Sequence, residues 1–275
     1  MPGIVDAHQH VWALDAHDQP WLRLPGNEPL LRDYTEADLR PLAAAAGVTA
    51  TVVVQTIAEA PETPELLALA AASDLIAAVV GWVDLQSDQV ADAIAALQDG
   101  PDGSYLTGIR HPVLIESDED WLRRPPVQRG LAAVGVAGLC YDLVLPPVML
   151  PAAIDAVAAC PDTTFVLDHL GNIEDPARPD EAWTSAIRRL AGFPNTYCKV
   201  SGVLAGPADV TPAFDVALAA FGPGRLMFGS DWPPCTLAGS YESVVATARS
   251  LIAGLSPAEQ EDILAATARR AYRLS

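Results

Sequence analysis

Residues 49–85, TATVVVQTIAEAPETPELLALAAASDLIAAVVGWVDL, contain the pattern that decides the fold. Two β-rich runs, TATVVVQ at 49–55 and AAVVGWVDL at 77–85, flank a segment, PELLALAAAS, whose apolar residues have helical spacing. Strands that start about 30 residues apart, with a helix between them, form a βαβ unit. This stretch therefore predicts two parallel strands joined by a helix.

The same alternation recurs along the whole chain. Ser256-Pro-Ala-Glu259 is a helix start, and we expect the final helix to reach about Tyr272. Eight strands, each followed by a helix, predict the α/β class and a closed (β/α)8 TIM barrel, with a doubly wound open sheet as the alternative. Further β-rich runs occur at 3–8, 106–111, 138–144, 164–171, 196–202 and 225–232.

No break in composition divides the chain, so residues 1–275 are predicted to form a single domain. Hydrophobic residues make up 51% of the sequence, enough for a sizeable core. Residues 11–33 are too long for a simple connection between the first strand and its helix. We expect them to form an extended loop over the mouth of the barrel.

The net charge of −19 disfavours two classes of partner, nucleic acid and anionic membrane surfaces, because a field of that sign repels both. A small-molecule substrate is expected instead. The N-terminus lacks the pattern of a signal peptide, no apolar run is long enough to span a membrane, and the four cysteines show no CxxC spacing. These features predict a cytoplasmic protein with reduced cysteines, and they leave its oligomeric state open.

In a TIM barrel the active site lies at the carboxyl ends of the strands. The first run ends in Asp6-Ala-His8-Gln-His10, and alternation along a strand points His8 and His10 to the same side. Neutral imidazole is a common zinc ligand, so this pair is a candidate metal half-site. Two structural histidines that hydrogen-bond to loop groups are the alternative.

Two further strand ends carry candidate catalytic residues, His169 in LDHLG and Asp231 in GSDWP. His169 is a candidate metal ligand or polariser of a substrate carbonyl. Asp231 is a candidate metal ligand and general base for water. Taken alone, His169 is more simply interpreted as a structural histidine, and Asp231 as an aspartate that caps a turn. Together with the first strand, they place three histidines and an aspartate on one face, which favours a hydrolytic site.

The remaining strand ends supply candidate substrate contacts. Lys199, the only lysine of the chain, lies in a core-like strand, where it is costly unless it is paired or contacts a ligand. We expect it to hold a substrate oxygen. Arg110 and His111 end the fourth run, and alternation favours Arg110 as the residue that faces the site.

Aromatic and acidic neighbours complete the candidate pocket. Trp12 and Tyr141 are candidate pocket walls, although packing is the simpler role for a tryptophan. Asp142 is a candidate partner for a histidine or for Arg110. No GxSxG, P-loop or GxGxxG after a strand is present, so serine acyl-enzyme chemistry, NTP hydrolysis by a P-loop and Rossmann dinucleotide binding lack support.

The motifs DAHQHVW, GIRH, YDL, LDHLGN, YCKVSG and FGSDWP, in this order, resemble the amidohydrolase-2 branch of the amidohydrolase superfamily, and most closely its sugar-lactonase and dicarboxylate-lactonase group. The resemblance runs from residue 4 to the C-terminal helix. It implies a (β/α)8 barrel that hydrolyses a lactone, such as L-rhamnonolactone, L-fuconolactone or a pyrone dicarboxylate. By motif, the residues that correspond to the family's site are His8, His10, His169 and Asp231.

The resemblance also bears on the cofactor. Binuclear members of the superfamily carry a lysine at the end of strand four, whereas this chain has Arg110 and His111 there. The resemblance therefore implies one divalent metal ion, with zinc as the expected ion, or none.

We predict a hydrolase that opens the ring of a sugar-acid lactone or a carboxylated lactone by water attack, with Asp231 as general base. A metal-dependent decarboxylase of an aromatic or muconate-type acid on the same barrel is the alternative. A non-catalytic barrel that binds a small ligand is a further one.

Overall fold

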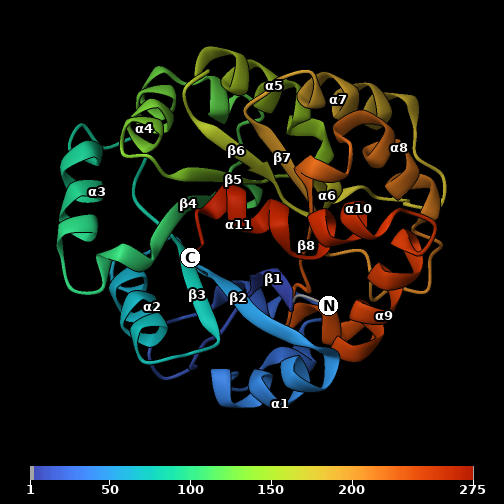
Figure 1. Cartoon of the computed structure of the whole chain (residues 1–275). Coiled ribbons are helices and arrows are strands. Elements are labelled where there is room, and N and C mark those ends of the chain that lie inside the picture. The colour runs from blue at the N-terminus through green and yellow to red at the C-terminus, as the bar shows by residue number, and fades with distance from the viewer. Residues whose placement is uncertain (1–2, 275) are drawn as a thin grey trace.

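Eight parallel strands form the centre of the structure, a computed structural model that describes residues 3–274 (Figure 1). They pair in sequence order from β1 to β8 and form a nearly closed barrel. This order confirms the (β/α)8 barrel and excludes the doubly wound sheet, whose strand order reverses at a switch point. The strands are β1 Ile4–Gln9, β2 Val48–Val54, β3 Ile76–Gly81, β4 Leu106–Pro112, β5 Cys140–Val144, β6 Thr164–Leu167, β7 Thr196–Val200 and β8 Leu226–Phe228.

Helices follow the strands and surround the barrel (Figure 1). Ser256 caps α10 as expected, because its side chain accepts a hydrogen bond from the backbone N–H of Glu259. None of the helices in residues 3–274 is long and apolar enough to span a membrane. The helices are α1 Glu36–Ala46, α2 Glu62–Ala71, α3 Val90–Asp99, α4 Pro125–Val136, α5 Leu150–Ala159, α6 His169–Asn172, α7 Glu181–Ala191, α8 Thr211–Phe221, α9 Tyr241–Ile252, α10 Pro257–Glu261 and α11 Thr267–Tyr272.

The C-terminal helix closes the amino end of the barrel. A π-helical turn, Asp262–Ala266, separates α10 from α11, and the helix then reaches Tyr272 as predicted. Tyr272 joins the apolar cluster inside the barrel. At the start of β5, Cys140 Sγ lies 2.9 Å from the carbonyl oxygen of Ala271. For this reason α11, drawn in red, lies near the centre of the ring of strands in Figure 1.

An irregularity in β1 decides which way the two predicted metal ligands point. Val5 and Ala7 pack inside the barrel, so strict alternation would turn His8 outward. Between Asp6 and Gln9, however, three steps along β1 pair with only two along β2. The extra residue is a β-bulge, and beyond it both histidines face the interior.

Three predicted strands end four residues earlier than expected. The runs at 77–85, 164–171 and 225–232 are strands only as far as Gly81, Leu167 and Phe228. Beyond the last two, the backbone turns sharply, because His169 and Asp231 adopt φ values of 55° and 56°. These values lie in the left-handed region, which costs a non-glycine residue about 1 kcal/mol or more and is frequent at functional sites.

The long connection after β1 lies at the mouth of the barrel, as expected. It contains two 3₁₀ turns, Pro20–Arg23 and Glu28–Leu30. Trp21 and Leu24 from this loop line the same cavity as His10 and His169.

Candidate active site

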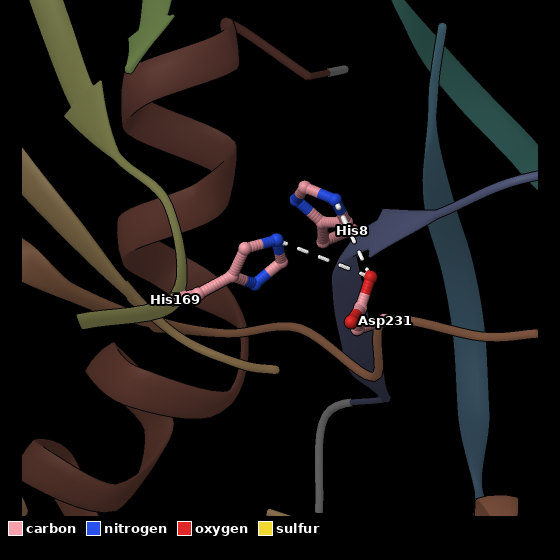
Figure 2. Close-up of side chains that lie close together, drawn as sticks. All are labelled: His8, His169 and Asp231. Atoms are coloured by element: carbon pink, nitrogen blue, oxygen red, sulfur yellow. Dashed lines mark ion pairs between the residues drawn. The ribbon is translucent and has the colours of Figure 1, made fainter. Parts of the chain in front are cut away.

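Three imidazoles and one carboxylate meet at the carboxyl end of the barrel. The Asp231 Oδ1 atom lies 3.8 Å from His8 Nε2, 3.6 Å from His10 Nε2 and 4.0 Å from His169 Nε2. The Nε2 atoms of His8 and His10 are 3.1 Å apart. Figure 2 shows the rings of His8 and His169 facing the carboxylate of Asp231. The structure therefore brings together the four residues that the sequence selected as metal ligands.

Glycine lets the third histidine reach this cluster. Gly202, just after β7, has a φ of +72°, and a Cβ at this position would lie 2.7 Å from His169 Nδ1. The same nitrogen lies 2.9 Å from Ser201 Oγ. The turn after β7 therefore both contacts and makes room for the imidazole of His169.

Gly202→Ala is expected to lower kcat/KM by about tenfold, because the new Cβ would displace the imidazole of His169. A displacement of ~1 Å in an active site can lower the rate about 100-fold, and a smaller displacement is expected here. Steady-state kinetics with a lactone and circular dichroism check this result. Gly222→Ala is a matched control, since Gly222 has a φ of +70° but a Cβ there would have no atom within 4 Å. Equal activity losses in both variants would contradict the role given to the close approach.

Hydrogen bonds define a single tautomer for His10 but are compatible with both tautomers of His8. His10 Nδ1 lies 2.7 Å from the Val54 carbonyl oxygen, which can only accept, so Nδ1 carries the proton and Nε2 has a free lone pair. His8 Nδ1 lies 3.1 Å from the donor Lys199 Nζ and 3.4 Å from the acceptor Asp168 Oδ1. When Nδ1–H donates to Asp168, Nε2 is free for a metal. When Nδ1 accepts from Lys199, Nε2–H is a donor.

Lys199 is the centre of a buried ion cluster beneath His8. Its Nζ donates to Asp142 Oδ2 at 2.6 Å and lies 3.0 Å from Asp168 Oδ1. The Tyr272 hydroxyl, from α11, donates to Asp142 at 2.8 Å. Lys199 has no exposed surface. It is thus placed to orient His8 rather than to touch substrate, and Asp142 pairs with Lys199 rather than with a histidine or an arginine.

Burial and neighbouring groups set the charges of the cluster. Burial lowers the pKa of His8, His10 and His169, so these imidazoles are neutral at neutral pH. Burial alone would raise the pKa of Asp231, but the surrounding imidazoles, His169 foremost, outweigh it and hold this pKa below its usual range. The cluster is therefore an ionised carboxylate facing neutral nitrogen ligands.

A cavity of about 660 Å³ leads to this cluster and is lined by His10, Arg110 and His169 among others. Arg110 Nη1 donates to Asp168 Oδ2 at 3.2 Å and lies 3.3 Å from His8 Nε2. Its Nη2 donates to the backbone carbonyl of Gln55 at 2.5 Å. Arg110 faces the site, as the alternation along β4 predicted.

Three predicted substrate contacts lie away from the cluster, on the outer side of the strands or beneath the loop. His111 Nε2 lies 2.8 Å from Glu116 Oε1, and its ring stacks on Trp121. Tyr141 is fully buried and packs edge-on against an aromatic ring of β6. Trp12 is buried in packing, with its Nε1 donating to the Arg32 carbonyl at 2.8 Å. His111 and Tyr141 point away from the site because each is next to an inward-facing residue on its own strand, and successive side chains of a strand point to opposite sides.

A sequence model of a family described as Amidohydrolase matches residues 5–274. The chain belongs to the amidohydrolase family. A curated relative, L-fucono-1,5-lactonase from Burkholderia multivorans (strain ATCC 17616 / 249), is 38% identical over 98% of this chain and 96% of its own. Family membership therefore rests on the whole barrel rather than on one motif.

Solved structures agree with this assignment. A crystal structure of an amidohydrolase from Burkholderia multivorans with bound zinc is 36% identical, with a TM-score of 0.92, covering 99% of this chain and 100% of that one. The 5-carboxyvanillate decarboxylase of Sphingomonas paucimobilis has a TM-score of 0.72 over the full length of both chains. At 15% identity, the decarboxylase shares the amidohydrolase fold alone.

The donor set of this amidohydrolase fits a divalent metal ion. His8, His169 and Asp231 offer ligand atoms within 4.8 Å of one another, and His10 Nε2 adjoins two of them. Atoms that each lie about 2.0–2.2 Å from one ion are at most about 4.4 Å apart, and the three separations from Asp231 and the one between His8 and His10, 3.1 to 4.0 Å, satisfy this limit. No Lys or Arg of residues 3–274 forms an ion pair with Asp231, so its charge is open to a cation.

Several residues of this arrangement were not selected from the sequence. Asp168 had a signal, because it precedes His169 at an inward position of the same strand end. Ser201 and Gly202 follow Lys199 in YCKVSG but carry no signal of their own. Tyr272 contacts Asp142 across 130 residues of sequence, and no local pattern indicates such a contact.

Proposed function

We propose that this chain hydrolyses a neutral lactone at the floor of the cavity. The observation that carries the proposal is the position of the Asp231 carboxylate, whose Oδ1 lies 3.6 to 4.0 Å from the Nε2 atoms of three histidines. The resemblance to L-fucono-1,5-lactonase over nearly the whole chain supports lactone chemistry. A sugar-acid lactone of that kind is the substrate class we favour.

Asp231 acts as the general base. Its carboxylate takes a proton from water while the water oxygen bonds to the lactone carbonyl carbon. The π electrons of the carbonyl move to its oxygen and form a tetrahedral oxyanion. The oxyanion then collapses, the bond from the carbonyl carbon to the ring oxygen breaks, and Asp231 returns the proton to that oxygen. Lactone and water thus give one hydroxy acid.

Positive charge and donors next to the carbonyl stabilise the oxyanion, which is usually the largest catalytic contribution. Arg110 lines the cavity beside His8 and supplies a fixed positive charge there. His8, His10, His169 and Asp231 would hold a divalent ion, with zinc the ion we favour. When bound, such an ion supplies a Lewis acid that polarises the carbonyl.

The charges of the cavity favour a neutral substrate over a carboxylated one. Arg110 is the only Lys or Arg among the described residues that line it, and Asp168 and Gln55 already engage its guanidinium. Glu59 adds a negative charge to the lining. Lys199 is fully buried between two carboxylates and cannot neutralise a ligand.

L-fucono-1,5-lactone and L-rhamnonolactone are expected to be hydrolysed with a kcat/KM at least about tenfold above that for 2-pyrone-4,6-dicarboxylate. A carboxylate without a free cationic partner costs well over the ~1.4 kcal/mol that corresponds to tenfold. Acid release in a weakly buffered indicator assay measures all three rates. Preference for the dicarboxylate would refute the charge argument, and no acid release from any lactone would refute the proposed function.

A further inference from the structure

Exposed apolar side chains gather at the catalytic end of the barrel. Of the large hydrophobic residues that are exposed in residues 3–274, only Leu42 and Val136 lie on α-helices. The others lie in the connections that follow β1, β4, β5 and β8, at the end of the barrel where the histidines meet: Leu14, Leu24, Leu31, Leu114, Ile115, Val148 and Leu237.

Three of these side chains form the outer wall of the active-site cavity. Leu24, Leu114 and Ile115 are 58%, 53% and 65% exposed, and all three line the cavity that also contains His10 and Arg110. Leu114 and Ile115 belong to the 3₁₀ turn Val113–Ile115, which directly follows β4. Because the histidines and Arg110 are buried, the cavity has a polar floor, and its exposed outer half is mainly apolar, with Asp18 and Glu59 as its charged groups.

This apolar wall is a candidate binding surface, because ligand cavities are lined mainly by apolar side chains with a few polar groups. The net charge of −19 disfavours a second copy of the chain and an anionic membrane. The apolar wall is instead continuous with the floor where the lactone carbonyl reacts. At about 660 Å³, the cavity falls in the range that holds a drug-sized ligand rather than one small ring.

We propose that the outer half of the cavity is a subsite for an alkyl substituent on the lactone ring, formed by Leu24, Leu114 and Ile115. The inference rests on the proposed lactone hydrolysis and extends it to neutral lactones with an apolar side chain. The ring lies at the polar floor, next to Asp231 and Arg110. The substituent extends outward along the loop after β1 and the turn after β4.

A series of δ-lactones that differ only in the alkyl chain on the carbon bearing the ring oxygen tests the subsite. Methyl, propyl and pentyl members are compared with the unsubstituted ring and with L-fucono-1,5-lactone by acid release. The value of kcat/KM is expected to rise by up to about fourfold per methylene, the factor for burying one methylene, ~0.8 kcal/mol. A flat or inactive alkyl series beside an active sugar lactone would overturn the subsite, whereas inactivity with every lactone would overturn the proposed function.

The double variant Leu114→Ser/Ile115→Ser is expected to flatten the dependence on chain length. Both side chains are exposed, so their replacement leaves the core intact. Val136→Ser is the matched control, because Val136 is 89% exposed at the end of α4 and outside the cavity. An unchanged slope in the double variant would overturn the subsite. If the wild type also sedimented as a dimer and the double variant as a monomer, the wall would be assigned to a second copy instead.

Discussion

Asp231→Asn is expected to lower kcat by at least about 100-fold, the usual lower scale for loss of a general base. The amide keeps the size of the side chain but cannot accept the proton of water. The low pKa of Asp231 means that the wild-type base is ionised across the neutral range, so the loss should be similar at all pH values where the protein is folded. Initial rates at saturating lactone measure the effect.

Asp88→Asn serves as the control for this variant, because Asp88 is 91% exposed and pairs only with the surface residue Arg129 among the described residues. Its kcat should match the wild type. If Asp231→Asn kept near wild-type turnover and changed only KM, Asp231 would be a binding group and another residue would be the base.

Lys199→Met is expected to destabilise the folded chain by about 3–5 kcal/mol, the cost of removing one partner of a buried ion pair. Burial alone would lower the pKa of Lys199, but Asp142 and Asp168 raise it, so the lysine is charged in the fold. Removal of its charge leaves two buried carboxylates beside His8. Urea unfolding followed by circular dichroism measures the change in free energy.

A second substitution separates charge from packing in this cluster. In Lys199→Met/Asp142→Asn one of the uncompensated charges is gone, so part of the lost stability should return. Methionine and lysine have similar length, so packing alone predicts little change in either variant. Wild-type stability of Lys199→Met would show that the lysine is not the counter-ion of these carboxylates.

The sequence predicted the barrel and the four side chains that meet at its carboxyl end, because both depend on local pattern and strand position. Strand alternation correctly selected Arg110 over His111 as the inward-facing residue. It also predicted correctly that His8 and His10 share a side, but not that the side is the interior, since that depends on the bulge between Asp6 and Gln9. A bulge changes the register without an obvious sequence signature.

The buried supports of the site could not be predicted in the same way. Burial cost indicated that Lys199 needed a partner, and two carboxylates supply it. Which carboxylates, however, depends on the inward register of the side chains on β5, β6 and β7, which pair side by side. The contact of Tyr272 with Asp142 depends on the insertion of α11 into the amino end of the barrel, which follows from tertiary packing alone.

The most direct test of the account is the stoichiometry of the reaction with L-fucono-1,5-lactone, followed by pH-stat titration and headspace analysis before and after chelation. We expect one equivalent of acid per lactone, no CO₂, no activity above background in Asp231→Asn, and loss of most activity on chelation with recovery on addition of zinc. Tight binding without acid release, or release of CO₂ from an aromatic acid in place of acid from the lactone, would contradict lactone hydrolysis at this site.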